Sequence, residues 1–213
     1  MRVVKMAVGT VATLSALVIG LLIASEKSSF DTRDSELRQF SANLILLDRQ
    51  LVQYGPEAQE ARELLKRYAS HKLDATWKTR ASSSATNRDG WLLLEDAQDR
   101  VRALTSASDA QRWLQSRALQ ISGDVAKTRW LLDVQTGSSI PAAFLVLLVF
   151  WLAAIFTSFG LLAPINTTVI TALFVCALSV SGAIFLIVEM DTPFEGLIQI
   201  SSEPMCDALA RLR

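Results

Sequence analysis

The chain has 213 residues, with 21 Lys and Arg against 21 Asp and Glu, and 51% of its residues are hydrophobic. The zero net charge excludes the basic surface that nucleic-acid binding needs for counterion release. A mean hydropathy of +0.31 beside 20% charged residues is atypical of a soluble globular protein. The charges are segregated, because residues 134–188 contain no Asp, Glu, Lys or Arg while residues 26–133 contain many of both signs. This division predicts a membrane part and a charged part outside the bilayer.

Three stretches are long enough to cross the hydrocarbon core of a bilayer, which needs about 20 apolar residues in a helix. They cover residues 6–24, 140–162 and 169–188. Pro164 stops the second helix and Asn166 can cap the third, which predicts a tight antiparallel hairpin. The first stretch also fits a signal peptide, but it exceeds the usual apolar length of about 7–15 residues and continues into a helical pattern. We interpret it as an uncleaved membrane helix.

With three spans, the charged domain and the C-terminal tail lie on one side of the membrane. Basic residues gather near the membrane ends on that side: Lys27, Arg33, Arg38, Lys127 and Arg129, with Arg211 and Arg213 in the tail. The positive-inside rule therefore predicts a cytoplasmic domain. Arg2 and Lys5 at the opposite end of the first span weigh against this orientation.

The charged part shows helical periodicity and no alternating strand pattern of any length. Between residues 31 and 54 the apolar residues follow a 3-4 spacing typical of a coiled coil: Leu37, Phe40, Leu44, Leu47, Leu51 and Tyr54. Gly55 and Pro56 end this helix, and a second helix with Ala61, Leu65 and Tyr68 on its buried side follows.

The rest of the charged part continues the helical pattern. We expect a loop at residues 80–90, a helix at 91–104, and a long helix at 109–135 capped by Ser108. The predicted buried face of the long helix consists of Leu114, Ala118, Ile121, Val125, Thr128 and Leu132. A tail helix at 202–212 carries Met205, Leu209 and Leu212, which would lie on the membrane or plug a vestibule.

The expected organisation is therefore all-α, with three transmembrane helices and a long-helix extramembrane domain. The boundaries are 1–25 for the first transmembrane helix, 26–138 for the cytoplasmic domain, 139–190 for the transmembrane hairpin and 191–213 for the tail.

Several short motifs along the chain resemble a bacterial family described as bestrophin-like. They are Leu46-Leu-Asp-Arg, Tyr54-Gly-Pro-Glu, Ala110-Gln-Arg-Trp-Leu-Gln-Ser-Arg, Phe150-Trp-Leu, Phe159-Gly-Leu-Leu-Ala-Pro and Glu189-Met-Asp-Thr-Pro-Phe-Glu-Gly. The resemblance covers nearly the whole chain. It implies a bacterial inner-membrane homo-oligomer, a pentamer as in bestrophins, that conducts anions such as chloride through a central pore. Family members usually carry one more membrane helix ahead of the one that starts here, so the resemblance leaves two alternatives: the chain is a natural short form, or its start is placed too late.

The first membrane helix carries two candidate functional stripes. Small residues that allow close helix approach are Gly9, Thr13, Ala16 and Gly20. Three leucines on another side are Leu14, Leu17 and Leu21, and the resemblance implies that they form the apolar neck of a pore, which gates by dewetting. The alternative is that these leucines face lipid or a neighbouring helix.

An acidic group follows the third span, where bestrophins bind calcium. Its members are Glu189, Asp191 and Glu195, and calcium takes about six to eight oxygen ligands. The chain lacks the dense Asp run that follows in calcium-activated members, so we prefer an acidic interfacial turn shaped by Pro193 and Gly196.

The leading functional prediction is a passive oligomeric ion channel in the lipid bilayer. No predicted span contains an ionisable residue, which counts against a proton-coupled transporter. His71 is the only histidine, and we find no catalytic triad, phosphate-binding Gly loop or zinc motif around Cys176 and Cys206, so we predict neither an enzyme nor a cofactor. The alternative is a membrane-anchored scaffold or sensor that binds a partner protein through its coiled stalk.

Overall fold

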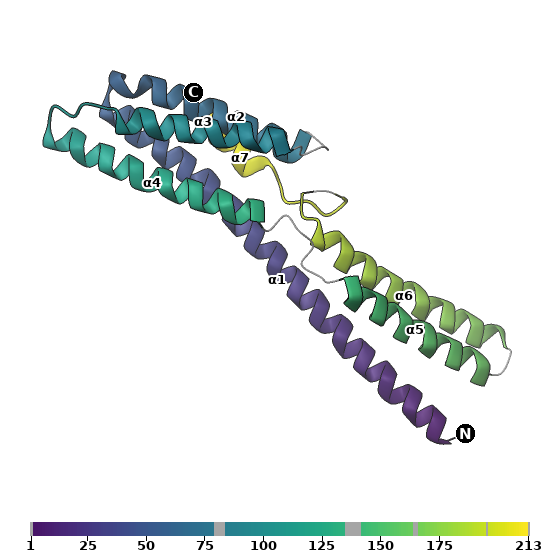
Figure 1. Cartoon of the computed structure of the whole chain (residues 1–213). Coiled ribbons are helices and arrows are strands. Elements are labelled where there is room, and N and C mark those ends of the chain that lie inside the picture. Colours follow the sequence, from purple (N-terminus) through teal and green to yellow (C-terminus); the bar gives the residue numbers. More distant parts are fainter. Residues whose placement is uncertain (1, 79–83, 135–141, 164–165, 195, 213) are drawn as a thin grey trace. The chain divides into compact units, whose positions relative to one another are not determined.

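The structure, a computed structural model, describes residues 2–78, 84–134, 142–163, 166–194 and 196–212. It divides into two compact units. The apolar unit comprises Met1–Asp31 and Gly137–Gln199, and the charged unit comprises Thr32–Thr136 and Ile200–Arg213. One long helix, α1 (Arg2–Tyr54), contributes to both units (Figure 1). Every regular element in the described residues is helical, which confirms the predicted all-α fold.

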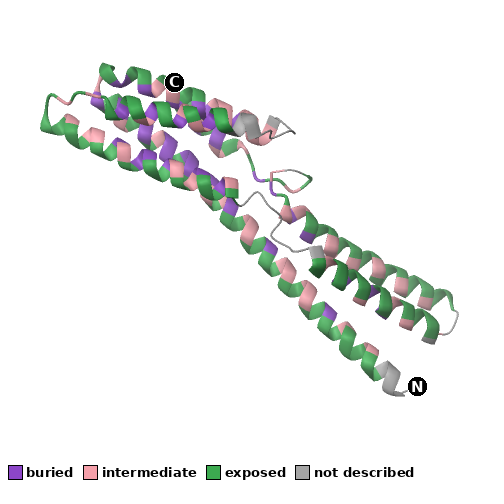
Figure 2. Ribbon diagram, in the orientation of Figure 1, coloured by how far each residue is buried: buried purple, intermediate pink, exposed green. Residues whose placement is uncertain are grey.

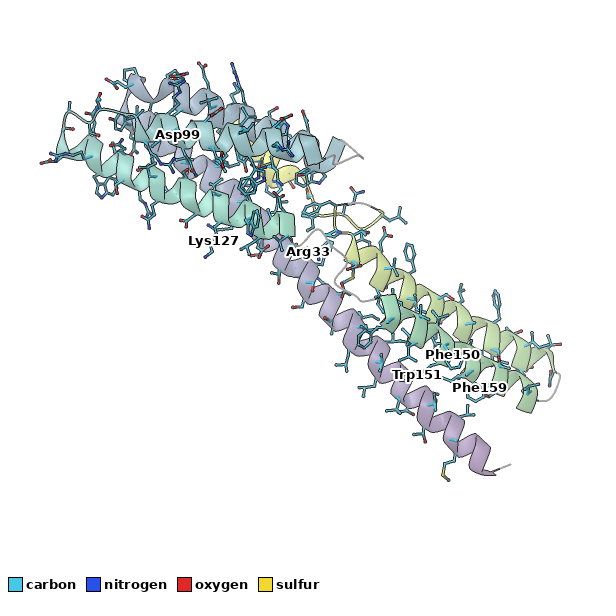
Figure 3. All side chains as sticks on the ribbon, in the orientation of Figure 1. Arg33, Asp99, Lys127, Phe150, Trp151 and Phe159 are labelled. Carbon is cyan, nitrogen blue, oxygen red and sulfur yellow. The ribbon has the colours of Figure 1, made fainter. Side chains whose placement is uncertain are left out.

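The apolar unit contains the first part of α1 together with α5 (Ala142–Leu162) and α6 (Thr167–Asp191). These three helices are long and apolar enough to cross a membrane, as predicted. Asn166 caps α6, because its side-chain oxygen accepts the backbone N–H of Thr168 at 3.2 Å. Helices α5 and α6 expose most of their residues, including Phe150 and Phe159 (Figures 2 and 3). Such apolar surface needs lipid or other protein to cover it.

The charged unit is a bundle of the later part of α1 with α2 (Gln59–Leu73), α3 (Ser84–Arg102), α4 (Asp109–Val134) and the short α7 (Glu203–Arg211). A 3₁₀ turn (Pro56–Ala58) precedes α2, and a π-helical turn (Asp74–Lys78) follows it. The predicted 3-4 stripe of α1 forms the core, since all six of its residues are at most 4% exposed. The α1 residues with coiled-coil-like spacing are therefore buried by other parts of the same chain.

Side-chain contacts between helices set the register of this bundle. Asp48 of α1 pairs with Arg62 of α2 at 2.7 Å, and Phe40 of α1 lies edge-on to Tyr68 of α2 with ring centroids 6.2 Å apart. The Gln111 side-chain amide at the start of α4 donates to the Tyr54 carbonyl at 3.3 Å. Helices α2 and α4 therefore both run antiparallel to α1.

Two local predictions are wrong. The loop expected at residues 80–90 becomes helix from Ser84 onward, because α3 packs on α2 and α4 and this tertiary contact overrides the weak helix propensity of the segment. Gly90 lies inside α3, where a Cβ atom would come within 3.1 Å of both the Arg129 guanidinium and the His71 ring. On α4, Thr128 is not fully buried, and Arg129 takes the core position instead.

The apolar face of the tail helix α7 packs inside the charged unit. Met205 and Ala208 of α7 are fully buried, and Ser41 of α1 contacts the Met205 sulfur at 3.9 Å. The Trp77 indole N–H donates to the Ile200 carbonyl at 3.1 Å and holds the chain just before α7. These contacts replace the expectation that the tail lies on the membrane or plugs a vestibule.

Candidate pore helix and the junction after the third span

Both predicted stripes of α1 are exposed in the single chain. Leu14, Leu17 and Leu21 are 51%, 60% and 62% exposed. The small-residue stripe is exposed as well, namely Gly9, Thr13, Ala16 and Gly20, and the Thr13 hydroxyl donates to its own helix at the Gly9 carbonyl. Apart from the backbone of α1 itself, no atom of the described residues lies within 4 Å of a Cβ built on Gly9 or Gly20, so the described part of the chain leaves this side of α1 open.

The opposite side of α1 is the side buried by its own chain. Ser15 and Glu26 are each only 2% exposed, and at 3.6 residues per turn they share one face of the helix. The leucine and small-residue stripes lie away from this face. A single α1 cannot enclose a pore.

The acidic group after the third span is used in a backbone turn. The Glu189 carboxylate at the end of α6 accepts the backbone N–H groups of Leu197 and Ile198. Glu195 lies outside the described residues, and no three His, Cys, Asp or Glu side chains in the described part gather as metal ligands. One oxygen of the Glu189 carboxylate is thus engaged by backbone donors of its own chain, as expected for an acidic interfacial turn. The calcium-ligand assignment stays a prediction.

Gly196 makes this turn possible, so replacing Gly196 tests whether the turn holds the segment after the third span. Its φ of +92° is one that other residues rarely adopt, and a Cβ there would overlap the Glu189 carboxylate. We expect Gly196→Ala to break the turn and to speed amide hydrogen exchange at Leu197 and Ile198 about tenfold or more, the effect of roughly 1.4 kcal/mol of lost local stability.

Exchange measured by mass spectrometry on the full chain in nanodiscs checks this expectation. Gly182→Ala is the matched control, since a Cβ at this α6 position meets no atom within 4 Å. Unchanged exchange at Leu197 and Ile198 in the Gly196 variant would show that the Glu189 turn does not hold this segment.

Sequence reasoning missed a buried cationic cluster in the charged unit. The Arg129 guanidinium, in a side chain 1% exposed, lies 4.3 Å from the ring centroid of Trp91 and 5.3 Å from that of Tyr68. Cations placed over aromatic faces gain about 2 kcal/mol when desolvated. Its Nε also lies 3.4 Å from Asp133, the next turn of α4. We name Arg129, Trp91, Tyr68, Asp133 and Lys72 the arginine cage.

Lys72 and Asp133 complete the arginine cage with an ion pair of 2.7 Å. Burial lowers the pKa of Lys72 below its usual 10.5, and the attraction of Asp133 opposes this shift. Burial also raises the pKa of Tyr68 above its usual 10.0, against the partial opposition of the Arg129 charge. The cage ties α2, α3 and α4 together at one end of the bundle, and its two cations face a single acidic side chain of the cage.

The geometry defines a helical membrane protein in which one helix continues from an apolar unit into a charged bundle. A sequence model of the bestrophin-like domain matches residues 2–205, so the chain belongs to the bestrophin-like family. Among curated proteins, no significant match was found.

Crystal structures of a bacterial bestrophin homologue from Klebsiella pneumoniae are similar in fold. One point variant shares 15% identity at a TM-score of 0.68, over 96% of this chain and 86% of that chain. The structure phased with zinc shares 17% identity at a TM-score of 0.65, over 94% and 84%. The membership and the fold confirm the resemblance seen in the sequence motifs.

Proposed function

We propose that the chain assembles into a homo-oligomeric ion channel, with five copies as the family resemblance implies. Anions such as chloride would pass through it down their gradient. The observation that carries the proposal is the leucine stripe of α1, which stays exposed on the side that its own chain leaves open. Membership of the bestrophin-like family supports the same conclusion.

In the proposed pore, each copy contributes Leu14, Leu17 and Leu21 to a stack of apolar rings. Such rings form a neck that excludes water when narrow and conducts when widened or wetted. The small stripe beside them lets neighbouring α1 helices approach closely. Because residues 134–188 carry no ionisable group and the α1 apolar run carries none either, the proposed conduction is passive.

The proposed location is the bacterial inner membrane, with the charged unit and the tail in the cytoplasm. The positive-inside rule supports this orientation through Lys27, Arg38 and Lys127, which are exposed basic residues flanking the spans. No calcium gate is part of the proposal, since Glu189 accepts backbone donors of its own chain.

The test is chloride efflux from liposomes containing the purified protein. We expect Leu14→Ala/Leu17→Ala/Leu21→Ala to raise the efflux rate several-fold, because a wider and less apolar neck is easier to wet. The control is Leu147→Ala/Leu161→Ala/Leu178→Ala, which removes the same atoms from exposed positions on α5 and α6 and should leave efflux unchanged.

Two outcomes would contradict the channel. A monomer or compact dimer in nanodiscs leaves too few helices to surround an axis. The second is a correctly folded oligomer that passes no ions, either as the wild-type protein or as the Leu14→Ala/Leu17→Ala/Leu21→Ala variant. That result would instead favour a membrane-anchored scaffold whose charged unit binds a partner.

A further inference from the structure

The segment after the third span carries a large apolar side chain that the described part of the apolar unit leaves uncovered. Leu197 belongs to this unit and is 84% exposed. We call Gly196, Leu197, Ile198 and Gln199 the Glu189 turn, because the Glu189 carboxylate accepts the backbone N–H groups of Leu197 and of Ile198, the latter at 3.3 Å. The Gln199 side-chain amide donates to the Gly196 carbonyl at 2.6 Å. A hydrogen-bonded turn therefore holds Leu197 outward.

The position of Glu189 along α6 places the Glu189 turn at the edge of the bilayer. The apolar run 169–188 is about 30 Å long at about 1.5 Å per residue, which matches the thickness of the hydrocarbon core. Glu189 is the first ionisable residue after this run. Because helical side chains tilt toward the N-terminus of their helix, the Glu189 side chain leaves α6 in the direction of the bilayer. Its hydrogen bond to Leu197 keeps that residue level with the membrane boundary.

The side of α6 next to the Glu189 turn is apolar and exposed. Phe185 and Leu186 precede Glu189 by four and three residues, so all three lie on one side of the helix. Phe185 and Leu186 are 49% and 41% exposed. Leu197 therefore continues an apolar surface that the span already presents. An exposed apolar surface that ends in polar groups is typical of a membrane contact.

The polar groups of the turn suit the lipid headgroup region. The exposed neighbours of Leu197 and Ile198 in the turn, Gly196 and Gln199, carry no charge. The Glu189 carboxylate accepts two N–H donors, which lowers the cost of holding a charge at the edge of the bilayer. The turn can therefore lie among the headgroups without leaving an ion uncompensated.

We propose that Leu197 inserts between the headgroups and the acyl chains, so that the Glu189 turn anchors the end of the third span to lipid. The partner is the bilayer itself. Removal of the leucine side chain from water drives the insertion, and no rearrangement is needed because the turn already holds Leu197 outward. The inference is independent of the proposed channel, since it needs only α6 as a membrane span.

Spin labelling of the full chain in liposomes tests the insertion, in a background carrying Cys176→Ser and Cys206→Ser. A label on Leu197→Cys is compared for its accessibility to oxygen, which enters lipid, and to a nickel chelate, which stays in water. The lipid reference is Leu178→Cys within α6, and the water reference is Arg112→Cys in the charged unit; the native side chains are 64% and 70% exposed. We expect nickel access at position 197 to be several-fold lower than at position 112, with oxygen access close to that at position 178.

Two results would overturn the insertion. Nickel access equal to that at position 112 would place Leu197 in water, on the outer surface or in a water-filled pore. Low access to both reagents would show that protein covers Leu197, either another part of the chain or a second copy. Neither result depends on ion conduction, so the channel proposal is judged separately by chloride efflux.

Replacing Glu189 tests whether the turn positions Leu197. We expect Glu189→Ala to raise nickel access at the labelled position 197 several-fold, because the two N–H donors lose their acceptor. Glu189→Gln keeps a side-chain oxygen that accepts these donors, so this matched variant should retain the low nickel access. Low nickel access that persists in the alanine variant would show that the Glu189 turn is not the anchor.

Discussion

Replacing Arg129 by alanine is expected to lower the free energy of unfolding of the charged unit by about 3–5 kcal/mol. The guanidinium is buried between the rings of Trp91 and Tyr68, so its removal leaves a cavity that the rigid rings cannot fill. Asp133 also loses its ion pair with Arg129, while its ion pair with Lys72 remains. The loss is therefore one of packing and of charge compensation together.

Thermal unfolding of the full chain in nanodiscs, followed by circular dichroism, checks this expectation. For a chain of this size the loss corresponds to a midpoint lower by about 6–20 °C. Arg112→Ala on the same helix is the control. This arginine is 70% exposed and pairs with the exposed Asp109, so we expect a change within about 0.5 kcal/mol. Equal shifts for the two variants would mean that the arginine cage does not hold the bundle.

Much of the architecture was predictable because it depends on patterns local in the sequence. The run from residue 134 to 188 contains no charged residue, which predicts membrane-spanning segments. In the hydrocarbon core the backbone N–H and C=O groups of such segments must be hydrogen-bonded within the protein, as they are in helices. The 3-4 stripe from Leu37 to Tyr54 predicted the buried side of α1, and all six of its members are buried. Asn166 and Ser108 were identified as caps because a short polar side chain before an apolar run accepts free backbone N–H groups, and both do so.

The arginine cage was not predictable in this way. Pattern reading assigns arginine to the surface, so Thr128 was placed in the α4 core instead of Arg129. Arg129 can be buried only because Trp91 and Tyr68 arrive from two other helices, and that is a property of the tertiary fold. The spacing Ala118, Ile121, Val125, Arg129, Leu132 was a usable signal, since it follows one helical face without interruption. The proposed neck depends on other copies of the chain, and a single sequence does not show how copies pack.

The arginine cage also makes stability fall at alkaline pH. Tyr68 ionises near pH 10 in the unfolded chain, but burial keeps it protonated to higher pH in the folded state. Above pH 10 the folded state therefore holds a proton that the unfolded state has released. Stability is then lost as pH rises, by at most about 1.4 kcal/mol per pH unit for this one group.

Tyr68→Phe is expected to remove this alkaline loss, measured as unfolding free energy in urea between pH 10.5 and 11.5. Lys72 acts with the opposite sign, because its lowered pKa makes stability rise with pH, but this contribution ends near its usual pKa of 10.5. Tyr54→Phe is the control, since it removes a tyrosine and keeps Tyr68. If the Tyr68 and Tyr54 variants lose stability with the same slope, Tyr68 is not held protonated by the fold, and the cage must be open to water.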